Sequence, residues 1–332
     1  MKTNSEIDAV ITWVDGDDPK WLAKKKQQQQ KLHYQVADEQ RYRDFNTLKY
    51  VFRSLENYAP WFHRIYLVTD QQLPVWLNVN HPCLQIVDHR DYIAAKYLPT
   101  FNSNVIDLNL DQISGLSENF ILFNDDLVLT KKVQATDFFV DELPKDTAAL
   151  SPICPEIDGI ESAVLNNIKL INSQFTQKQV VGKYWRKFFK WQYGQYNFRT
   201  LFLLPYTKFS GFMDFHMPLS LKKSTFSVLR QKFPTYFAQT NQQPFRSNDD
   251  ITIWLARYWQ LCQGQFQPRS AKFGKYLQLS DLKAIKLALK NPKYKALCLN
   301  DVALTKEQVQ AVNQYLPDLL EQKYPNKSRF EK

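Results

Sequence analysis

Short apolar runs that end in polar turns, with helical segments between them, are the feature that most limits the folds open to this chain. Residues 7–14 are apolar and β-branched, and residues 65–68, 84–87 and 120–123 are shorter runs typical of strands buried on both faces. Apolar residues recur every three or four positions from Tyr42 to Tyr58 and predict an amphipathic helix. Strands that alternate with helices predict an α/β fold with a mostly parallel, Rossmann-like sheet.

The second half of the chain is more helical and more basic. Thr305 and Gln308 form a capping box that predicts the start of a last helix, broken around Pro317. Three further helices and two further strands are predicted, at residues 176–193, 220–232 and 250–263 and at residues 148–153 and 296–299.

No linker rich in Gly, Ser or Pro divides the sequence, so we expect one domain over residues 1–332. Its α/β core is expected over about residues 1–155, and a helical, basic elaboration over about residues 156–295. A closing strand and a C-terminal helix then follow over residues 296–332.

Glycine is scarce, and its scarcity excludes several phosphate-binding devices. The chain has 8 glycines, where average usage of about 7% would give roughly 23. Neither G-x-G-x-x-G nor G-x-x-x-x-G-K-[ST] occurs, so a glycine-built dinucleotide fingerprint or a P-loop is excluded. Any phosphate chemistry must therefore depend on side chains and metal.

Net charge and cysteine usage indicate which kind of partner the protein binds and in which cellular compartment it lies. The formal charge of +10 predicts an anionic partner, which could be a phosphate-bearing substrate, a membrane surface or a nucleic acid. The four cysteines are far apart and show no zinc-site spacing, which is typical of reduced thiols in the cytoplasm. The first residues are polar and lack the apolar stretch of a signal peptide. We therefore expect a cytoplasmic protein.

The sequence contains three pairs of adjacent aspartates, each at the end of an expected strand or at the start of an expected helix. Mg²⁺ in proteins is held by one or two carboxylates together with substrate phosphate oxygens. The pair Asp125 and Asp126 directly follows a buried strand, where ligands bind in parallel sheets, and metal binding and turn formation are equally good interpretations of it. For Asp17 and Asp18 we favour helix capping.

The third pair, Asp249 and Asp250, follows Arg246 immediately before an apolar helix. One carboxylate is expected to cap that helix, and the arginine would face a phosphate at the helix N-terminus. An Arg–Asp salt bridge that closes the loop is the alternative.

His216 is the histidine in the most unusual setting, between aromatic and apolar neighbours and close to Pro218. Histidine is the usual general base near neutral pH, although a structural core histidine is the alternative. Asn300 and Asp301 again follow a short strand. Together these residues predict a site with acids for metal, an arginine for phosphate and a histidine for protons.

At these positions the chain resembles the Stealth family of sugar-phosphate transferases. This family includes bacterial capsular polysaccharide phosphotransferases and the catalytic part of the animal lysosomal-enzyme N-acetylglucosamine-1-phosphotransferase. The matching blocks are residues 7–19 (IDAVITWVDGDDP), residues 41–129, FHMP at 215–218 with FRSNDD at 245–250, and CLND at 298–301. They follow one another in the family's order over most of the chain.

The resemblance implies a glycosyltransferase-A-like core and a requirement for Mg²⁺ or Mn²⁺. It also implies transfer of a hexose-1-phosphate or N-acetylhexosamine-1-phosphate from a UDP-sugar to a sugar hydroxyl of a cell-surface polysaccharide, with release of UMP. The functional residues that it implies are Asp15 with Gly16, Asp125, Asp126, His216, Arg246, Asp249 or Asp250, Asn300 and Asp301. The animal enzymes have a histidine and a glutamate after the arginine, where this chain has Ser247, Asn248 and Asp249, so the acid that contacts the metal there stays open.

The combined hypothesis assigns one role to each group. Asp15, Gly16 and Asn300 border the nucleotide, Arg246 binds the transferred phosphoryl group, and His216 takes the acceptor proton. The metal ligands are expected among Asp125, Asp126, Asp249, Asp250 and Asp301.

The acceptor is expected to be a polysaccharide or a lipid-linked glycan at the inner face of the cell membrane, with peripheral membrane association and without nucleic acid. One rival is a metal-dependent glycosyltransferase that releases UDP. Another is a non-catalytic polysaccharide-binding protein that uses the basic, aromatic stretch 176–193, whose amphipathic pattern places most of its aromatics in the core.

Overall fold

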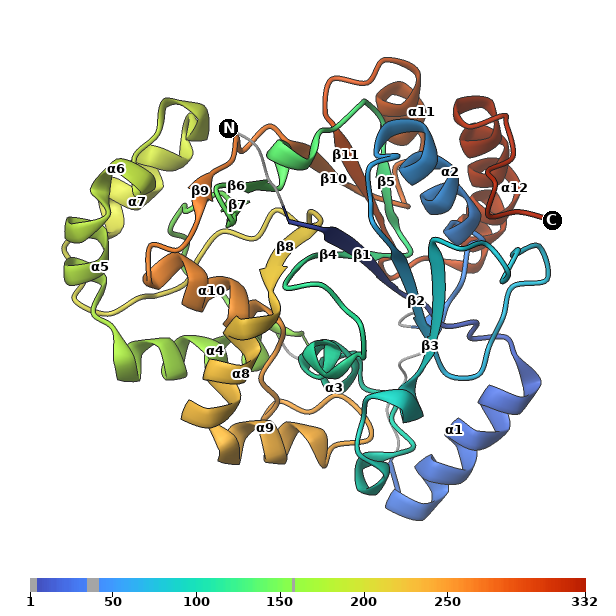
Figure 1. Ribbon diagram of the computed structural model, residues 1–332, viewed down its shortest axis with the longest axis horizontal. Helices are drawn as coiled ribbons and strands as arrows, with labels where there is room; N and C mark the ends of the chain where they lie inside the picture. The colour runs from blue at the N-terminus through green and yellow to red at the C-terminus, as the bar shows by residue number, and fades with distance from the viewer. Residues whose placement is uncertain (1–4, 35–41, 157–158) are drawn as a thin grey trace.

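A five-stranded sheet lies at the centre of the computed structural model, which describes residues 5–34, 42–156 and 159–332 (Figure 1). Arg41, the first residue of the second resemblance block, lies outside the described residues. The strand order is β3-β2-β1-β4-β8, and all neighbours are parallel except the antiparallel pair β4 and β8. The five strands are β3 (Leu84–Asp88), β2 (Ile65–Thr69), β1 (Ile7–Thr12), β4 (Asn119–Asn124) and β8 (Leu219–Lys222). The predicted mostly parallel α/β fold is therefore confirmed.

The central strands are buried on both faces because their alternate side chains enter two different cores. Val10, Phe120 and Leu122 lie in one hydrophobic cluster, whereas Ile11 and Phe123 lie in the other. This arrangement explains why the sequence shows continuous apolar runs rather than a polar and apolar alternation. The helices that pack in the first cluster include α3 (Ser103–Leu108), α4 (Glu161–Gln174), α8 (Lys223–Lys232), α9 (Pro234–Asn241) and α10 (Trp254–Cys262).

The second cluster is closed by a smaller sheet and by three helices. The strand order of this sheet is β10-β11-β5, with β11 parallel to β10 and antiparallel to β5. The elements are β5 (Leu127–Leu129), β10 (Gly274–Gln278), β11 (Ala296–Asn300), α2 (Leu48–Tyr58), α11 (Leu282–Lys290) and α12 (Lys306–Lys323). Because β5 follows β4 after one tight turn, the smaller sheet is joined directly to the central one.

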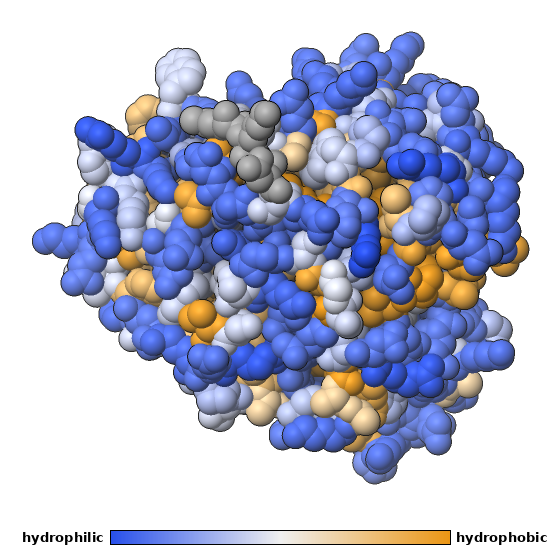
Figure 2. All heavy atoms as spheres, viewed as in Figure 1, coloured by the Kyte–Doolittle hydropathy of each residue, from blue (hydrophilic) through white to orange (hydrophobic). Residues whose placement is uncertain are grey.

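The remaining elements surround these layers. A third sheet contains β6 (Phe139–Val140), β7 (Leu143–Asp146) and β9 (Gln267–Pro268). Helix α1 (Pro19–Leu32) follows β1, and α5 (Gln177–Lys183), α6 (Trp185–Phe188) and α7 (Tyr196–Leu203) lie together at the left-hand edge of the molecule (Figure 1). The surface in the same view is mostly hydrophilic, with hydrophobic residues exposed between the hydrophilic ones, more of them in its right-hand half (Figure 2). No helix in the described parts of the chain is both long and apolar enough to cross a membrane.

Several predicted elements have different bounds, and packing explains the differences. Residues 148–153 form no strand, because Leu150 makes only an isolated bridge with Phe212, and the apolar pattern there reflects burial. Residues 220–232 divide into the end of β8 and all of α8. The last helix begins at the predicted capping box but continues through Pro317, because Leu316 and Leu320 keep it packed on the core.

The stretch 176–193 is not one amphipathic helix. It divides into α5, α6 and a short 3-10 turn, so its aromatic residues do not share one inward face. Phe188 and Tyr193 are buried, but Trp185 and Trp191 are exposed. The prediction that most of these aromatics lie in the core is therefore only partly right.

The predicted division into a core, an elaboration and a closing segment of a single catalytic domain stays a prediction. Strand β8 comes from the middle of the expected elaboration and completes the central sheet, and β11 completes the smaller sheet. The second half of the chain therefore supplies strands to the sheets of the core, in addition to the helices around them.

Candidate functional site

A cavity of about 640 Å³ opens at the carboxyl ends of β1, β4 and β11. In parallel sheets this edge is where ligands bind. The predicted site residues that line the cavity are Asp125, Asp126, Arg246, Asn300 and Asp301. Residues separated by more than half of the chain therefore share one site.

The turn between β4 and β5 places Asp125 and Asp126 at the floor of this cavity. Burial raises the pKa of Asp125 well above its usual value, and the neighbouring Asp126 carboxylate raises it further. Burial also raises the pKa of Asp126, while a hydrogen bond from the Cys298 thiol, 3.2 Å from Asp126 Oδ2, lowers it. Asp126 Oδ1 is buried and accepts no hydrogen bond from the described residues. An unpartnered anionic oxygen of this kind is suited to a cation.

The pairing of β11 with β5 brings Asp301 to the same place. The two strands are antiparallel, so the end of β11 lies beside the start of β5, and the Leu299 amide donates to the Asp126 carbonyl at 2.9 Å. Burial raises the pKa of Asp301, although Arg43, whose Nη1 lies 3.4 Å from the carboxylate, lowers it. Asp301 Oδ2 accepts no hydrogen bond from the described residues.

These carboxylates fit a hard divalent cation that shares its coordination with a substrate. No group of three or more His, Cys, Asp or Glu side chains in the described ranges is arranged to hold a metal by itself. Mg²⁺ typically takes one or two carboxylates, and substrate phosphate oxygens supply further ligands. Asp126 and Asp301 each offer a buried oxygen that accepts no hydrogen bond, although that of Asp301 is paired with Arg43 at 3.4 Å, so the predicted cofactor is compatible with the site and stays a prediction.

Arg246 and Asp107 lie on another wall of the cavity. Ser103 Oγ accepts hydrogen bonds from Arg246 Nε at 3.0 Å and Nη2 at 2.6 Å, which fixes the guanidinium. Burial raises the pKa of Asp107 to about 7, although Arg246 lowers it. An arginine held in this way can bind a phosphoryl group with the donors that face the cavity.

The pair Asp249 and Asp250 does not line the cavity. Asp250 is fully buried, and its Oδ2 accepts hydrogen bonds from the side-chain amides of Asn102 at 2.8 Å and Asn104 at 3.0 Å. It does not cap the following helix, which begins at Trp254 without a side-chain cap, so the expected cap is wrong. The side-chain amides of Asn102 and Asn104 donate hydrogen bonds to this carboxylate instead. The assignment of either aspartate to the metal stays a prediction.

The turn with Asp15 and Gly16 lies next to the cavity without lining it. The Gln72 side chain accepts from the Asp15 amide at 3.0 Å and donates to its carbonyl at 2.8 Å. A Cβ at Gly16 would lie 1.9 Å from the carbonyl oxygen of Tyr42, so only glycine fits there. Asp18 caps α1, as predicted.

His216 faces a second cavity, of about 1230 Å³, rather than the first one. Its side chain is 44% exposed and its φ is +48°, so it is not the buried core histidine of the alternative interpretation. Its ring lies 4.9 Å from the ring of Tyr276, a residue of β10 that pairs with Cys298 of β11. His216 also lowers the pKa of Asp126 electrostatically. His216 and Asp126 are therefore close enough to interact, although they line two different cavities.

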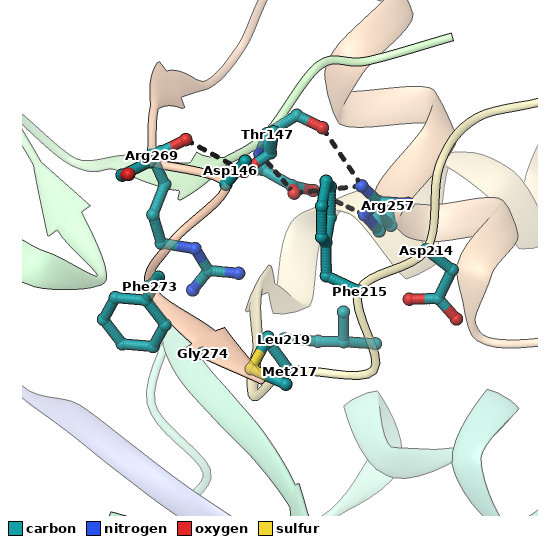
Figure 3. A pocket seen from close by; sticks show the side chains of 12 residues that line it. Asp146, Thr147, Asp214, Phe215, Met217, Leu219, Arg257, Arg269, Phe273 and Gly274 are labelled. Atoms are coloured by element: carbon teal, nitrogen blue, oxygen red, sulfur yellow. Dashed lines mark hydrogen bonds and ion pairs between the residues drawn. The ribbon is translucent and has the colours of Figure 1, made fainter. Parts of the chain in front are cut away.

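Two buried arginines hold the loop that carries His216 (Figure 3). Arg257 donates to both carboxylate oxygens of Asp146, at 2.7 and 3.1 Å, and to the Met213 carbonyl at 3.1 Å. Arg269 donates to the Pro218 carbonyl at 3.2 Å. Burial alone would lower the pKa of Arg257, but the Asp146 carboxylate raises it above its usual value. Arg257 could have been found as a charged side chain on the largely apolar helix α10, whereas no local pattern marks Arg269.

Sequence reasoning missed several cavity residues. Asp70 and His89 directly follow β2 and β3, so the rule that singled out the acids after β4 could have found them as well. Burial lowers the pKa of His89 to about 4, although Asp70 and Asp88 raise it, and Asp70 pairs with Lys24. The other missed lining residues with polar side chains include Arg43, Ser103, Asp107 and Glu161, which no local pattern marks.

Three family models match the chain. Stealth protein conserved region 1 matches residues 5–27, conserved region 2 matches residues 41–146 and conserved region 3 matches residues 215–259. The first three blocks of the resemblance fall within these regions.

Relatives with assigned names match over nearly the whole chain. The capsular polysaccharide phosphotransferase WcwK of Streptococcus pneumoniae is 41% identical over 335 residues, which cover 100% of both chains. The exopolysaccharide phosphotransferase cps2G of Lactiplantibacillus plantarum is 38% identical, over 98% of this chain and 96% of its own. The receptor polysaccharide phosphotransferase WefC of Streptococcus gordonii is 37% identical, over 98% of this chain and 99% of its own.

Solved structures are more distant. The apo-form glycosyltransferase GlyE of Streptococcus pneumoniae has a TM-score of 0.39 and 9% identity, over 96% of this chain and 63% of that one. The galactosyltransferase LgtC, in complex with donor and acceptor sugar analogues, also has a TM-score of 0.39 and 9% identity, over 95% of both chains.

Proposed function

This chain belongs to the Stealth protein family and is a sugar-phosphate transferase, and on that premise we propose its donor, its acceptor and the roles of its residues. It transfers a hexose-1-phosphate or N-acetylhexosamine-1-phosphate from a UDP-sugar to a hydroxyl group of a cell-surface polysaccharide. A phosphodiester forms and UMP is released. The observation that carries this proposal is that His216 lies close enough to Asp126 to act on it electrostatically, while the two residues line two different cavities.

The first cavity takes the donor. Its volume of about 640 Å³ lies within the range usual for small-molecule sites. The turn of Asp15 and Gly16 borders the nucleotide together with Asn300, and Arg246 binds the phosphoryl group that is transferred. Because Ser103 holds the guanidinium in place, little side-chain freedom is lost when the phosphate binds.

Asp126 and Asp301 would hold Mg²⁺ or Mn²⁺ through their buried oxygens that accept no hydrogen bond, with Asp125 beside them. When bound, such a cation neutralises charge on the diphosphate and on the leaving UMP. Burial raises the pKa values of all three carboxyl groups, and the Asp126 carboxylate raises that of Asp125 further, so a bound cation would favour their ionised forms.

The second cavity takes the acceptor. Its walls carry Tyr196, Phe215 and Tyr276, aromatic side chains of the kind that stack on sugar rings. His216 accepts the proton of the acceptor hydroxyl while that oxygen attacks the β-phosphorus. The bond between the β-phosphorus and the bridging oxygen breaks, and UMP leaves with the electron pair. The bond between sugar and phosphate stays intact.

The reaction is assigned to the cytoplasm, at the inner face of the cell membrane. All four cysteines are free, which supports a reducing compartment. The proposed acceptor is a growing polysaccharide or a lipid-linked glycan.

The test is a screen of UDP-sugars with Mg²⁺ and a polysaccharide acceptor, with the nucleotide product identified by chromatography and the polymer examined by ³¹P NMR. We expect UMP and a phosphodiester signal. His216→Ala should lower turnover at least about a hundredfold while donor binding is retained. The exposed histidine at the end of α1 provides the matched control, as His33→Asn, which should turn over normally.

Two outcomes would contradict the proposal. Stoichiometric UDP without phosphodiester phosphorus would identify a glycosyltransferase that attacks the anomeric carbon. Normal turnover by the His216→Ala variant would show that another group takes the proton.

A further inference from the structure

Residues 162–213 carry most of the excess charge of the molecule. This stretch contains no Asp or Glu, although the chain as a whole has 33. None of its basic side chains pairs with a carboxylate of the described residues. The basic residues are Lys169, Lys178, Lys183, Arg186, Lys187, Lys190, Arg199 and Lys208. With a formal charge of +10 for the chain, these eight side chains dominate its field.

Helix α7, within the same stretch, has its apolar side outward. Phe198, Leu201 and Phe202 are 63%, 51% and 76% exposed, and they follow one another at helical spacing. The one fully buried residue of this helix is a threonine, Thr200. A helix of a globular protein normally shows the reverse pattern, with its apolar stripe inward. An exposed apolar face of this kind marks an interaction surface.

Other aromatic side chains extend this surface. Trp191 is 97% exposed, and Trp185 and Tyr206 are also exposed. Helices α5, α6 and α7 lie together at one edge of the molecule, away from the central sheet (Figure 1). Six of the eight basic residues, all but Lys169 and Lys208, therefore belong to the same peripheral unit as the exposed apolar residues of α7.

Charge complementarity indicates which partner binds this surface. A second copy of the chain would bring two stretches of eight unpaired cations together, and their repulsion opposes self-association. An anionic bilayer attracts the cations and accepts the apolar side chains at the boundary between headgroups and acyl chains. Tryptophan and tyrosine are enriched at that depth.

We propose that the unit of α5, α6 and α7 docks this protein on an anionic lipid bilayer. Phe198, Leu201 and Phe202 enter the interface, and the surrounding Lys and Arg side chains contact lipid phosphates. Trp191 and Phe198 also line the cavity that contains His216, so docking brings the mouth of that cavity to the membrane surface. The docking needs neither donor nor acceptor, so its failure would leave the proposed transfer reaction untouched.

The test measures binding of the full chain to vesicles by co-sedimentation. We expect binding to vesicles that contain phosphatidylglycerol, weaker binding at high salt, and little binding to pure phosphatidylcholine. Leu201→Ser and Phe202→Ser, combined, should lower the partition coefficient about tenfold or more. Lys183→Gln, Arg186→Gln and Lys190→Gln, combined, should also lower it about tenfold or more, for anionic vesicles only.

The matched control is Leu287→Ser on α11, an aliphatic side chain of similar exposure, at 64%, on a different helix. It should bind vesicles like the unmodified chain, and circular dichroism should show that all variants are folded. Absence of binding to anionic vesicles would overturn the proposal. Binding that the α7 variant leaves unchanged would also overturn it. A concentration-dependent dimer that the α7 variant abolishes would assign the surface to a second copy instead.

Discussion

At the residue scale, the buried carboxyl group of Asp107 has a defined effect on stability. Burial raises its pKa from 3.8 to about 7. The folded state therefore keeps a proton that the unfolded state has already released, and this group makes the fold less stable as the pH rises from about 4 to about 7. Because Arg246 lies next to Asp107, its positive charge partly stabilises the ionised carboxylate.

We expect Asp107→Asn to raise the free energy of unfolding by about 2–4 kcal/mol at about pH 8 and by much less near pH 4. Urea unfolding at both pH values measures the difference. The exposed Asp318→Asn variant controls for the loss of one negative charge. An equal effect of Asp107→Asn at the two pH values would contradict the assigned cause.

Individual site residues differ in how far the sequence predicts them. Asp126 and Asp301 could be found because each follows a strand, and parallel strands end at one edge of a sheet. Arg43 and Asp107 could not, because they reach the cavity from a loop and a short helix that only tertiary packing positions. His216 is recognisable from its setting, but its place in a separate cavity depends on how β10 and β11 pack.

At the element scale, a buried arginine joins α2 to the C-terminal segment. Arg53 donates from Nε and Nη2 to the two carboxylate oxygens of Glu331, each at 2.8 Å, and from Nη1 to Glu321 at 2.9 Å and the Tyr324 carbonyl at 2.6 Å. Arg53 and Glu331 are each 4% exposed, so removal of the arginine leaves a buried carboxylate without its partner.

Arg53→Ala should lower the free energy of unfolding by about 3–5 kcal/mol, and Arg53→Lys by less, because lysine keeps the charge but not the planar fork. Denaturant unfolding measures both. Arg329 provides the control, because it joins the same two parts of the chain through Glu56 in an exposed pair. Arg329→Ala should cost less than about 1 kcal/mol. A similar loss in both alanine variants would show that burial is not the cause.

Whole elements are predictable from the sequence where burial and local signals agree. The central strands are buried on both faces, and the last helix has a true capping box, so their patterns were sufficient. Residues 148–150 are equally apolar and buried, but this segment pairs only through an isolated bridge and a few loop hydrogen bonds, and a pattern alone does not distinguish the two cases. Asp249 and Asp250 precede an apolar helix, yet the asparagines that bind Asp250 are distant in sequence.

At the scale of the whole molecule, donor and cation should stabilise the fold only together. The cavity floor holds several carboxylates, which repel a diphosphate. We therefore expect UDP with Mg²⁺ at about a hundred times the dissociation constant to stabilise the protein by about 2.7 kcal/mol, a rise of a few degrees in Tm. Either one alone should change Tm by less than about one degree.

Differential scanning fluorimetry measures these shifts. Asp301→Asn should reduce the joint shift, since Asp301 is a proposed ligand, while Asp318→Asn should leave it unchanged. The same shift for UDP in the presence of EDTA would contradict a site shared between donor and metal.

The antiparallel pairing of β5 with β11 has a consequence for synthesis of the chain on the ribosome. The two proposed metal ligands are Asp126 and Asp301, and the second is placed only when β11 has been added beside β5. A nascent chain that has completed the first four parallel strands thus has Asp126 in place, but neither Asp301 nor Arg246, which line the same cavity. Premature termination before residue 296 therefore leaves a product without Asp301, one of the two proposed metal ligands.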